Sequence, residues 1–227
     1  PARDAGRFHD SSMKSAASLP PRAAFILLAT LGLALRGSAA PNEPALKPIF
    51  NGRDLAGWTV APAPNVHWRV ENGVLIGESD EKRTGSMLWT EKSYKDFVLE
   101  LDVRWHGAKE DIDSGVTLRK PSFQVQMGTS RSLQRDMTGS MLTDGVGHPT
   151  RYPEAGRAKD WEKYFKVGGW NTFRIEARGH TFKVWINGHQ TTEYTDSKWA
   201  GAAPLGLQFH DAVKMKLEFR NIRLAEL

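Results

Sequence analysis

Apolar and polar residues alternate between residues 96 and 127 in the manner of half-buried β-strands. Within 97–105 every second residue is apolar, and residues 114–119 and 123–127 repeat the pattern. Because successive side chains of a strand point to opposite faces, each segment has one apolar and one polar face. If the three strands pair as neighbours, their polar faces form one surface. We take that surface as the candidate site.

Asn-Gly dipeptides predict two tight hairpin turns. Asn72-Gly73 separates two apolar-rich segments, and Asn187-Gly188 does the same later in the chain. Both residue types accept the positive φ angle that such turns require. Short alternating segments elsewhere bring the number of strand candidates to about ten.

Residues 128–169 show no sustained alternation and carry Gly and Pro at many positions. A loop of this length is uncommon in a compact domain unless it is functional. Within it, Trp161, Tyr164 and Phe165 are spaced by three and four residues, which predicts one short helix over 159–167.

Each predicted strand has one apolar face to bury, and a second sheet is the usual partner for such a face. The sequence therefore predicts an all-β fold, a jelly-roll β-sandwich of two antiparallel sheets with one long irregular loop and a short helix. The expected core consists of Phe97, Leu99, Leu101, Val116, Leu118, Val125, Phe173, Ile175, Leu207, Phe209, Leu217 and Phe219.

Residues 1–40 are predicted to be upstream residues and a signal peptide, and residues 41–227 a single domain. Lys14 and Arg22 precede an apolar run over 23–35, and small residues follow it. The run is shorter than the ~20 residues of a membrane span, and no membrane span is expected in the mature chain. The expected location is secreted or periplasmic. An uncleaved N-terminal anchor helix is the alternative.

The charge of the chain changes when the predicted signal peptide is left out. The whole chain has 31 Lys and Arg against 26 Asp and Glu, and residues 41–227 alone carry a net charge of +2. Binding to nucleic acid is therefore not predicted. The chain has no cysteine, which excludes disulfides, thiolate zinc sites and a cysteine nucleophile.

Eight short motifs follow one another along the chain, at residues 50–58, 68–75, 113–116, 123–127, 169–175, 185–188, 206–210 and 219–227. In this order they resemble the 3-keto-disaccharide hydrolase domain family, which belongs to the concanavalin A-like lectin and glucanase superfamily. The similarity runs from about residue 47 to the end of the chain. The order of the motifs is more specific than any single motif.

The resemblance implies a concanavalin A-like jelly roll with a concave sheet surface, export from bacterial cells and action on sugars oxidised at C3. The family usually has a Glu beside the Gln of the central strand, whereas this chain has Gln124, Val125 and Gln126. Where the family commonly has Asn before Ser-Gly, the chain has Asp113. Because Gln cannot act as a base, either another carboxylate serves or the protein binds without turnover.

Two functions follow from the resemblance. The first is an exported hydrolase that cleaves glycosidic bonds of 3-keto-disaccharides and glycosides by C2 proton abstraction and elimination. The second is a non-catalytic, lectin-like carbohydrate-binding domain. A retaining glucanase of the same superfamily is disfavoured, because the chain lacks the Glu-x-Asp-x-x-Glu run of such enzymes.

Elimination needs a base near C2, a group that holds the enolate, and an acid near the leaving oxygen. We expect His210 to carry the proton, because the ordinary pKa of histidine is about 6.5. Arg119 is expected to hold the enolate, and Glu100 or Asp102 to supply the missing carboxylate. The alternatives are a structural histidine and ion pairs of these two acids with Arg104 and Arg119.

Six further residues are expected to bind the saccharide. Amide side chains suit the hydroxyls of a sugar, and aromatic rings suit its faces. Hydrogen bonds between strands are the alternative for the glutamines, and packing is the alternative for the tryptophan. The six are Asp113, Ser114, Gln124, Gln126, Gln208 and Trp161.

The sequence does not indicate which cofactor, if any, the protein uses. A divalent metal ion held by Asp111, Asp113, Asp144 and His148 is a minor alternative, since acidic, Gly-rich loops are usually solvated. The expected partner is a carbohydrate, and the sequence does not indicate an oligomeric state.

Overall fold

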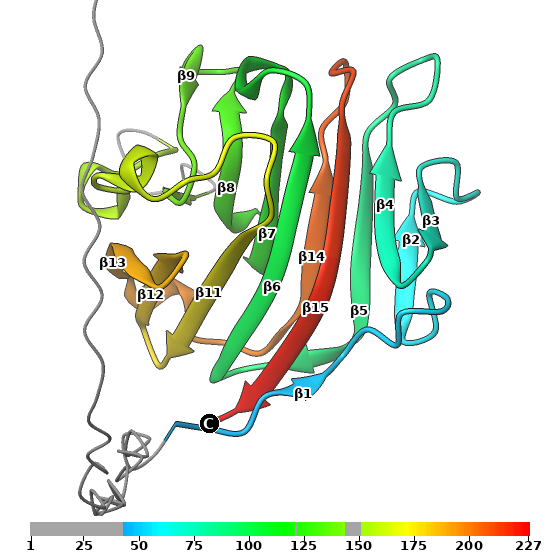
Figure 1. Cartoon of the computed structure of the whole chain (residues 1–227). Coiled ribbons are helices and arrows are strands. Elements are labelled where there is room, and N and C mark those ends of the chain that lie inside the picture. Colours follow the sequence, from blue (N-terminus) through cyan, green and yellow to red (C-terminus); the bar gives the residue numbers. More distant parts are fainter. Residues whose placement is uncertain (1–42, 121, 144–150) are drawn as a thin grey trace, which may run out of the picture. The chain divides into compact units, whose positions relative to one another are not determined.

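The computed structural model describes residues 43–120, 122–143 and 151–227, apart from the side chain of Lys109. Two antiparallel sheets pack face to face in this part of the chain (Figure 1), as the sequence predicts. Sheet A has the order β13 (His189–Thr195), β12 (Thr181–Ile186), β11 (Asn171–Arg178), β6 (Phe97–His106), β15 (Lys216–Glu226), β4 (Val74–Glu78) and β3 (Trp68–Glu71), with β1 (Lys47–Pro48) paired to β15.

Sheet B lies behind sheet A in Figure 1 and carries the candidate site. Its central strands β8, β7 and β14 pair side by side. Its order is β10 (Met141–Leu142), β8 (Phe123–Ser130), β7 (Asp113–Arg119), β14 (Ala203–Phe209), β5 (Ser86–Tyr94) and β2 (Trp58–Ala61), with β9 (Arg135–Asp136) paired to β8.

The prediction of the core is confirmed. All twelve expected core residues are at most 3% exposed, and they come from both sheets. Phe123, for example, stacks on Trp199 with ring centroids 5.0 Å apart and meets Phe182 edge-on at 4.6 Å. The alternation along each strand thus identifies the faces that pack between the sheets.

The two predicted hairpin turns are also confirmed. Asn72 and Gly73 have φ angles of 51° and 81°, and Asn187 and Gly188 have 50° and 84°. These turns join β3 to β4 and β12 to β13.

The helical segments among the residues that the structure describes are four short 3₁₀ helices: η1 (Lys109–Asp111), η2 (Glu154–Gly156), η3 (Trp161–Lys163) and η4 (Ser197–Trp199). The helix predicted over 159–167 is reduced to the single turn of η3. Asp160 precedes it with a left-handed φ of 54°, and Gly168 follows with a φ of 68°. Neither conformation continues a right-handed helix.

The predicted pairing of the three central strands is wrong in one respect. β7 and β8 pair in sheet B, but β6 lies in sheet A between β11 and β15. Alternation identifies the buried face of a strand but not the sheet that it joins, because an apolar face packs equally well from either layer. The polar face of β6 therefore belongs to a different surface from that of β7 and β8.

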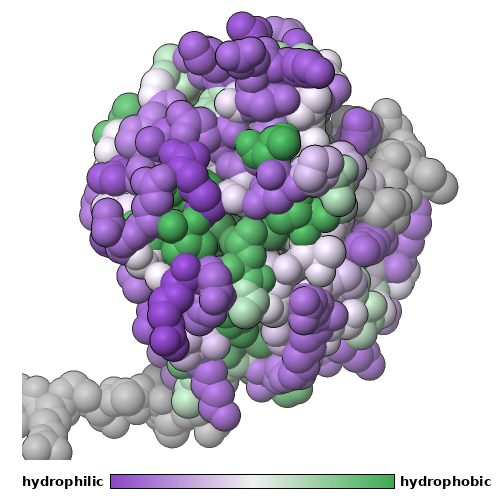
Figure 2. Space-filling model, turned by 90° about the vertical axis from the view of Figure 1, so that its right-hand side faces the viewer, coloured by the Kyte–Doolittle hydropathy of each residue, from purple (hydrophilic) through white to green (hydrophobic). Residues whose placement is uncertain are grey.

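The strands β2 and β3 are the last strands of their sheets and lie on the same side of the sandwich. Figure 2 looks at this side and shows apolar residues in its middle with polar residues around them. Val60 of β2 and Val70 of β3 are partly buried and pack against the core. The core thus reaches the surface between these two edge strands.

The predicted signal peptide and the predicted boundary after residue 40 lie outside the described residues. No helix in the described ranges is long and apolar enough to cross a membrane.

Candidate functional site

Three neighbouring strands of sheet B place a row of polar side chains on the face that points away from the core. Gln208 of β14 lies opposite Gly115 of β7, and Gly115 lies opposite Gln126 of β8. A Cβ atom at Gly115 would come within 2.7 Å of the carbonyl oxygen of Val125 and 2.9 Å of Nε2 of Gln124. Because the glycine has no side chain, the amide of Gln124 fills the space between the two other glutamines.

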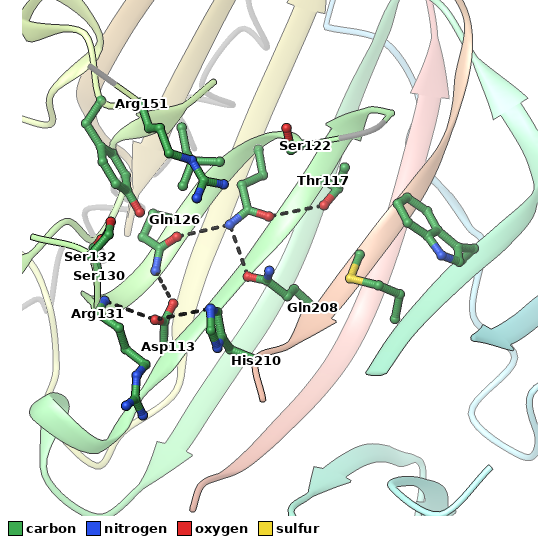
Figure 3. A pocket seen from close by; sticks show the side chains of 15 residues that line it. Asp113, Thr117, Ser122, Gln126, Ser130, Arg131, Ser132, Arg151, Gln208 and His210 are labelled. Atoms are coloured by element: carbon green, nitrogen blue, oxygen red, sulfur yellow. Dashed lines mark hydrogen bonds and ion pairs between the residues drawn. The ribbon is translucent and has the colours of Figure 1, made fainter. Parts of the chain in front are cut away.

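The three glutamines form one hydrogen-bond network (Figure 3). Gln124 Nε2 donates to Oε1 of Gln126 at 3.0 Å and to Oε1 of Gln208 at 3.1 Å, while Thr117 Oγ1 donates to Oε1 of Gln124 at 3.2 Å. Gln126 Nε2 donates in turn to Oδ1 of Asp113 at 2.8 Å. Buried polar groups need such partners, and the network fixes which atoms of the amides remain for a ligand.

Asp113 stands at one end of this network, beside His210. Its Oδ2 accepts a hydrogen bond from the backbone N–H of Arg131 at 3.1 Å and lies 3.9 Å from Nε2 of His210. Both carboxylate oxygens therefore already accept a hydrogen bond. Asp113 is buried, whereas the side chain of His210 is 35% exposed and faces the solvent-accessible part of the site.

The neighbours of His210 indicate its tautomer. Nδ1 lies 2.9 Å from the carbonyl oxygen of Asp211 and 2.9 Å from its Oδ1. Both atoms are acceptors, so Nδ1 carries the proton in the neutral ring. Nε2 then has a free lone pair, and the 3.9 Å gap to Asp113 leaves that lone pair uncommitted.

These residues line a hollow of about 140 Å³. This volume is below the ~300–1,000 Å³ of pockets that enclose drug-sized ligands, so the hollow takes part of a saccharide and the remainder lies outside it. The side chain of Arg151 points into the hollow in Figure 3 and adds a positive charge. Burial raises the pKa of Tyr152, which also lines it, so its phenol stays neutral at physiological pH.

The structure brings together five of the residues that the sequence predicts for the site. They are Asp113, Gln124, Gln126, Gln208 and His210, and all five line the hollow.

Arg119 is not among them, and its predicted position on the polar face is wrong. The pairing shifts between Thr117 and Arg119, so that Thr117 lies opposite Gln124 and Arg119 opposite Phe123. The extra residue at this β-bulge reverses the side on which the next side chain lies. Arg119 is 3% exposed, lies over the rings of Phe97 and Phe182 and donates to main-chain carbonyls.

Glu100 and Asp102 lie on sheet A and not at the hollow, because β6 belongs to that sheet. Glu100 forms ion pairs with Arg174 and Arg223. Asp102 accepts hydrogen bonds from Thr172 and Asn221, both at 2.7 Å. Asp102 also lies 3.4 Å from Nε of Arg220. The two acids therefore form ion pairs, as the alternative states, but not with Arg104 or Arg119 as it expects.

Two predicted binding residues are turned toward the interior. Ser114 is fully buried, and its Oγ donates to the backbone carbonyl of Gln208 at 2.7 Å. Trp161 is buried and packs edge-on against Phe165, with centroids 5.7 Å apart. Neither side chain lines the hollow.

Ten further residues line the hollow that the sequence does not predict for the site, among them Thr117, Trp89, Arg151 and Tyr152. Trp89 is partly exposed. The available signal is that Met87 and Trp89 lie on one face of β5, opposite Gln208 and Gly206 of β14. Arg151 and Tyr152 lie in the irregular loop, where no periodicity indicates a direction.

The metal alternative finds no support in the described ranges. Within them, no three His, Cys, Asp or Glu residues are grouped so that they could hold a metal ion. Asp144 and His148 lie outside the described residues.

Comparison with known proteins identifies related families and folds. The sequence model of the 3-keto-alpha-glucoside-1,2-lyase-like domain matches residues 45–225. No protein of curated function matches the chain.

Several crystal structures share the fold. Two proteins from Parabacteroides distasonis, each proposed to be a glycosyl hydrolase, align with TM-scores of 0.57 and 0.56 at 22% and 20% identity. The first alignment covers 81% of this chain and 100% of the other, and the second covers 80% and 94%. The kappa-carrageenase of Pseudoalteromonas carrageenovora aligns at 11% identity with a TM-score of 0.54, covering 85% and 98%. These similarities confirm the jelly-roll fold.

Proposed function

Because this chain belongs to the 3-keto-alpha-glucoside-1,2-lyase-like domain family, we propose that it cleaves glycosidic bonds of 3-keto sugars by elimination. The family supports a carbohydrate-related function. One observation supports the proposal of elimination at a 3-keto sugar. Nε2 of His210 has no hydrogen-bond partner among the described residues and lies beside the carboxylate of Asp113, at a hollow lined by the amides of three glutamines.

His210 is the proposed base. A ketone at C3 acidifies the proton on C2, and Nε2 takes this proton when C2 lies above it. The imidazolium that forms is stabilised by the negative charge of Asp113, whose Oδ2 lies 3.9 Å away. Asp113 itself stays an acceptor, because Gln126 and the N–H of Arg131 donate to its two oxygens.

Donor groups around the hollow are proposed to hold the enolate. Gln124 uses both amide protons inside the network, but within the described residues no protein acceptor takes a proton from Nε2 of Gln208. This amide and the guanidinium of Arg151 are therefore suited to the C3 oxygen and the neighbouring hydroxyls. They take the role that the sequence analysis gave to Arg119.

The bond changes balance in three steps. Nε2 of His210 takes the C2 proton, and the electrons of the C2–H bond form the enolate, with its negative charge on the C3 oxygen. The enolate electrons then form the C1–C2 double bond while the C1–O bond breaks, and the leaving oxygen takes a proton from water. Water then adds to the unsaturated ketone and gives the free 3-keto sugar, so that the net reaction is hydrolysis. Only the first step needs the base at C2.

The experiment is release of sugar from 3-keto-trehalose by the purified protein. We expect release, and a loss of about 10²- to 10⁴-fold in rate for His210→Gln, the range typical of a general base. His180→Gln, at an exposed histidine of the turn between β11 and β12, is the matched control and should keep full activity. Absence of release by the unaltered protein would remove the proposal.

A lectin-like carbohydrate-binding domain is the second candidate. The observation that favours it is the central position of Gln124, an amide where the resemblance implies a carboxylate, with its hydrogen bonds saturated by neighbours. Calorimetry that detects binding of a 3-keto-disaccharide without any turnover would select it. Export from the cell is likewise proposed on the sequence alone.

A further inference from the structure

A second hollow, of about 430 Å³, lies at the end of β7 and the beginning of β14. Three cationic side chains line it, Arg119, Lys120 and Lys198, and its lining contains no acidic residue. Trp199 and Pro204 provide apolar wall. The lining is thus strongly positive on a protein whose net charge is small outside the first forty residues.

The charge of Arg119 is the most unusual feature of this hollow. The guanidinium is buried, and all its hydrogen bonds go to main-chain carbonyls, those of Tyr94, Lys95, Leu118 and Trp199. Within the described residues no carboxylate forms an ion pair with it. The carboxylate of Asp96 offsets the positive charge only from a distance, without an ion pair. Burial of such a cation is costly, and an anion near it recovers part of that cost. The hollow is therefore suited to a negatively charged group.

Trp89 connects this hollow to the candidate site. A Cβ atom at Gly206 would lie 2.5 Å from the ring of Trp89, so the indole lies directly against the glycine on the face of sheet B. Trp89 also lines the first hollow. The ammonium of Lys120, which lines the second, lies 4.5 Å from the centroid of the same ring.

We propose that an anionic sugar unit binds across the two hollows, with its ring at Trp89 beside the first hollow and its carboxylate or sulfate in the second, near Lys120 and Arg119. If the first hollow holds the oxidised ring, as the proposed function requires, this unit is the leaving group. The substrate class is then a 3-keto-glycoside of an acidic sugar. An aromatic face binds the ring, and the cations select its charge.

The test follows the indole N–H signal of Trp89 in nitrogen-15 NMR, assigned with Trp89→Phe, during titration with three probes. The probes are methyl glucuronide, glucose 6-sulfate and the neutral methyl glucoside. We expect at least one anionic probe to bind five- to tenfold more tightly than the neutral one. The preference should vanish in Lys120→Gln and in 1 M NaCl, where the Debye length falls to about 3 Å.

Lys183→Gln, on β12 of sheet A, is the matched control and should keep the preference. Equal binding of all three probes, no binding of any, or a preference that survives Lys120→Gln would overturn the inference. The tighter of the two anions identifies the acidic group. Because the readout is binding, the result is separate from release of sugar from 3-keto-trehalose, which tests the proposed function.

Discussion

Nε2 of His210 lies 3.9 Å from Oδ2 of Asp113, across the neighbouring strands β14 and β7. This separation is too long for a hydrogen bond, so the lone pair of Nε2 is not bound to the carboxylate. The carboxylate of Asp113 instead lies beside the ring on which the proposed reaction would place a positive charge.

Removing the charge of Asp113 is expected to slow turnover. Asn at this position can still accept from Gln126 through its one oxygen, but its NH2 group then faces the backbone N–H of Arg131, so Asp113→Asn loses the negative charge and one hydrogen bond. We expect kcat to fall by about 10- to 100-fold with little change in KM, which corresponds to about 1.4–2.7 kcal/mol. Kinetics on a 3-keto-disaccharide measure both. Asp111→Asn, at the exposed Asp111 of η1, is the control, and equal losses in the two variants would refute the assignment.

Gln124→Glu is expected to lower stability and not to raise activity. A carboxylate at this buried position would face the carbonyl oxygens of Gln126 and Gln208 instead of donating to them. Leaving such groups unsatisfied costs about 1–3 kcal/mol. Urea denaturation measures the loss, and a large gain in sugar release would mean that His210 is not the base.

Gly115→Ala tests whether the hydrogen-bond network of the three glutamines requires a residue without a side chain at position 115. The new Cβ would meet the carbonyl oxygen of Val125 at 2.7 Å and displace the amide of Gln124. We expect a loss of about 1–3 kcal/mol in the free energy of unfolding, the usual range for overpacking, together with weaker saccharide binding. Gly201→Ala, where the new Cβ has no neighbour within 4 Å, should leave the free energy of unfolding unchanged. Equal stability of the two variants would contradict the geometry.

Arg119 is expected to act on stability, because it ties four main-chain carbonyls together. Arg119→Met keeps most of the apolar volume but leaves these carbonyls without their donor. We expect a loss of about 2–4 kcal/mol in the free energy of unfolding. Arg223→Met, at a partly exposed ion pair with Glu100, should cost less than about 1 kcal/mol. A small effect at Arg119 would argue against its buried position.

Stability should fall at alkaline pH in a way that depends on Tyr152. Burial raises the pKa of this phenol above the ordinary value of 10.0, so the unfolded chain releases the proton first. The stabilisation that the protonated phenol of Tyr152 gives the folded state is complete below pH 10 and is lost as the pH rises above 10. Denaturation at pH 9 and pH 11 should show a smaller drop for Tyr152→Phe. An unchanged drop would assign the effect to Tyr94 and Tyr194, whose pKa values are also raised by burial.

Much of the fold could be predicted from the sequence because the alternation of a strand is a local property. Phe97, Leu101, Val116 and Phe173 are buried as their parity indicates. The same parity places Gln124 and Gln126 on one face of β8, and Gln208 and His210 on one side of the chain around the end of β14. Local patterns therefore account for most of the polar row.

The remaining parts of the site depend on contacts between distant segments. Glu100 and Asp102 do not line the hollow, because β6 pairs in sheet A. The side chain of Arg119 points to the interior, because a single β-bulge shifts the pairing of β7. Trp89 lies on the exposed face because Gly206, more than a hundred residues later, leaves room for its ring. No periodicity in one segment contains this information.

The rate of cleavage of a 3-keto-glucoside that carries deuterium at C2 tests the central claim most directly. If His210 removes the C2 proton, the deuterated substrate should react several-fold more slowly than its protium counterpart, and His210→Gln should slow the reaction of both by about 10²- to 10⁴-fold. Equal rates for the two substrates, with sugar released from each, would contradict proton abstraction at C2.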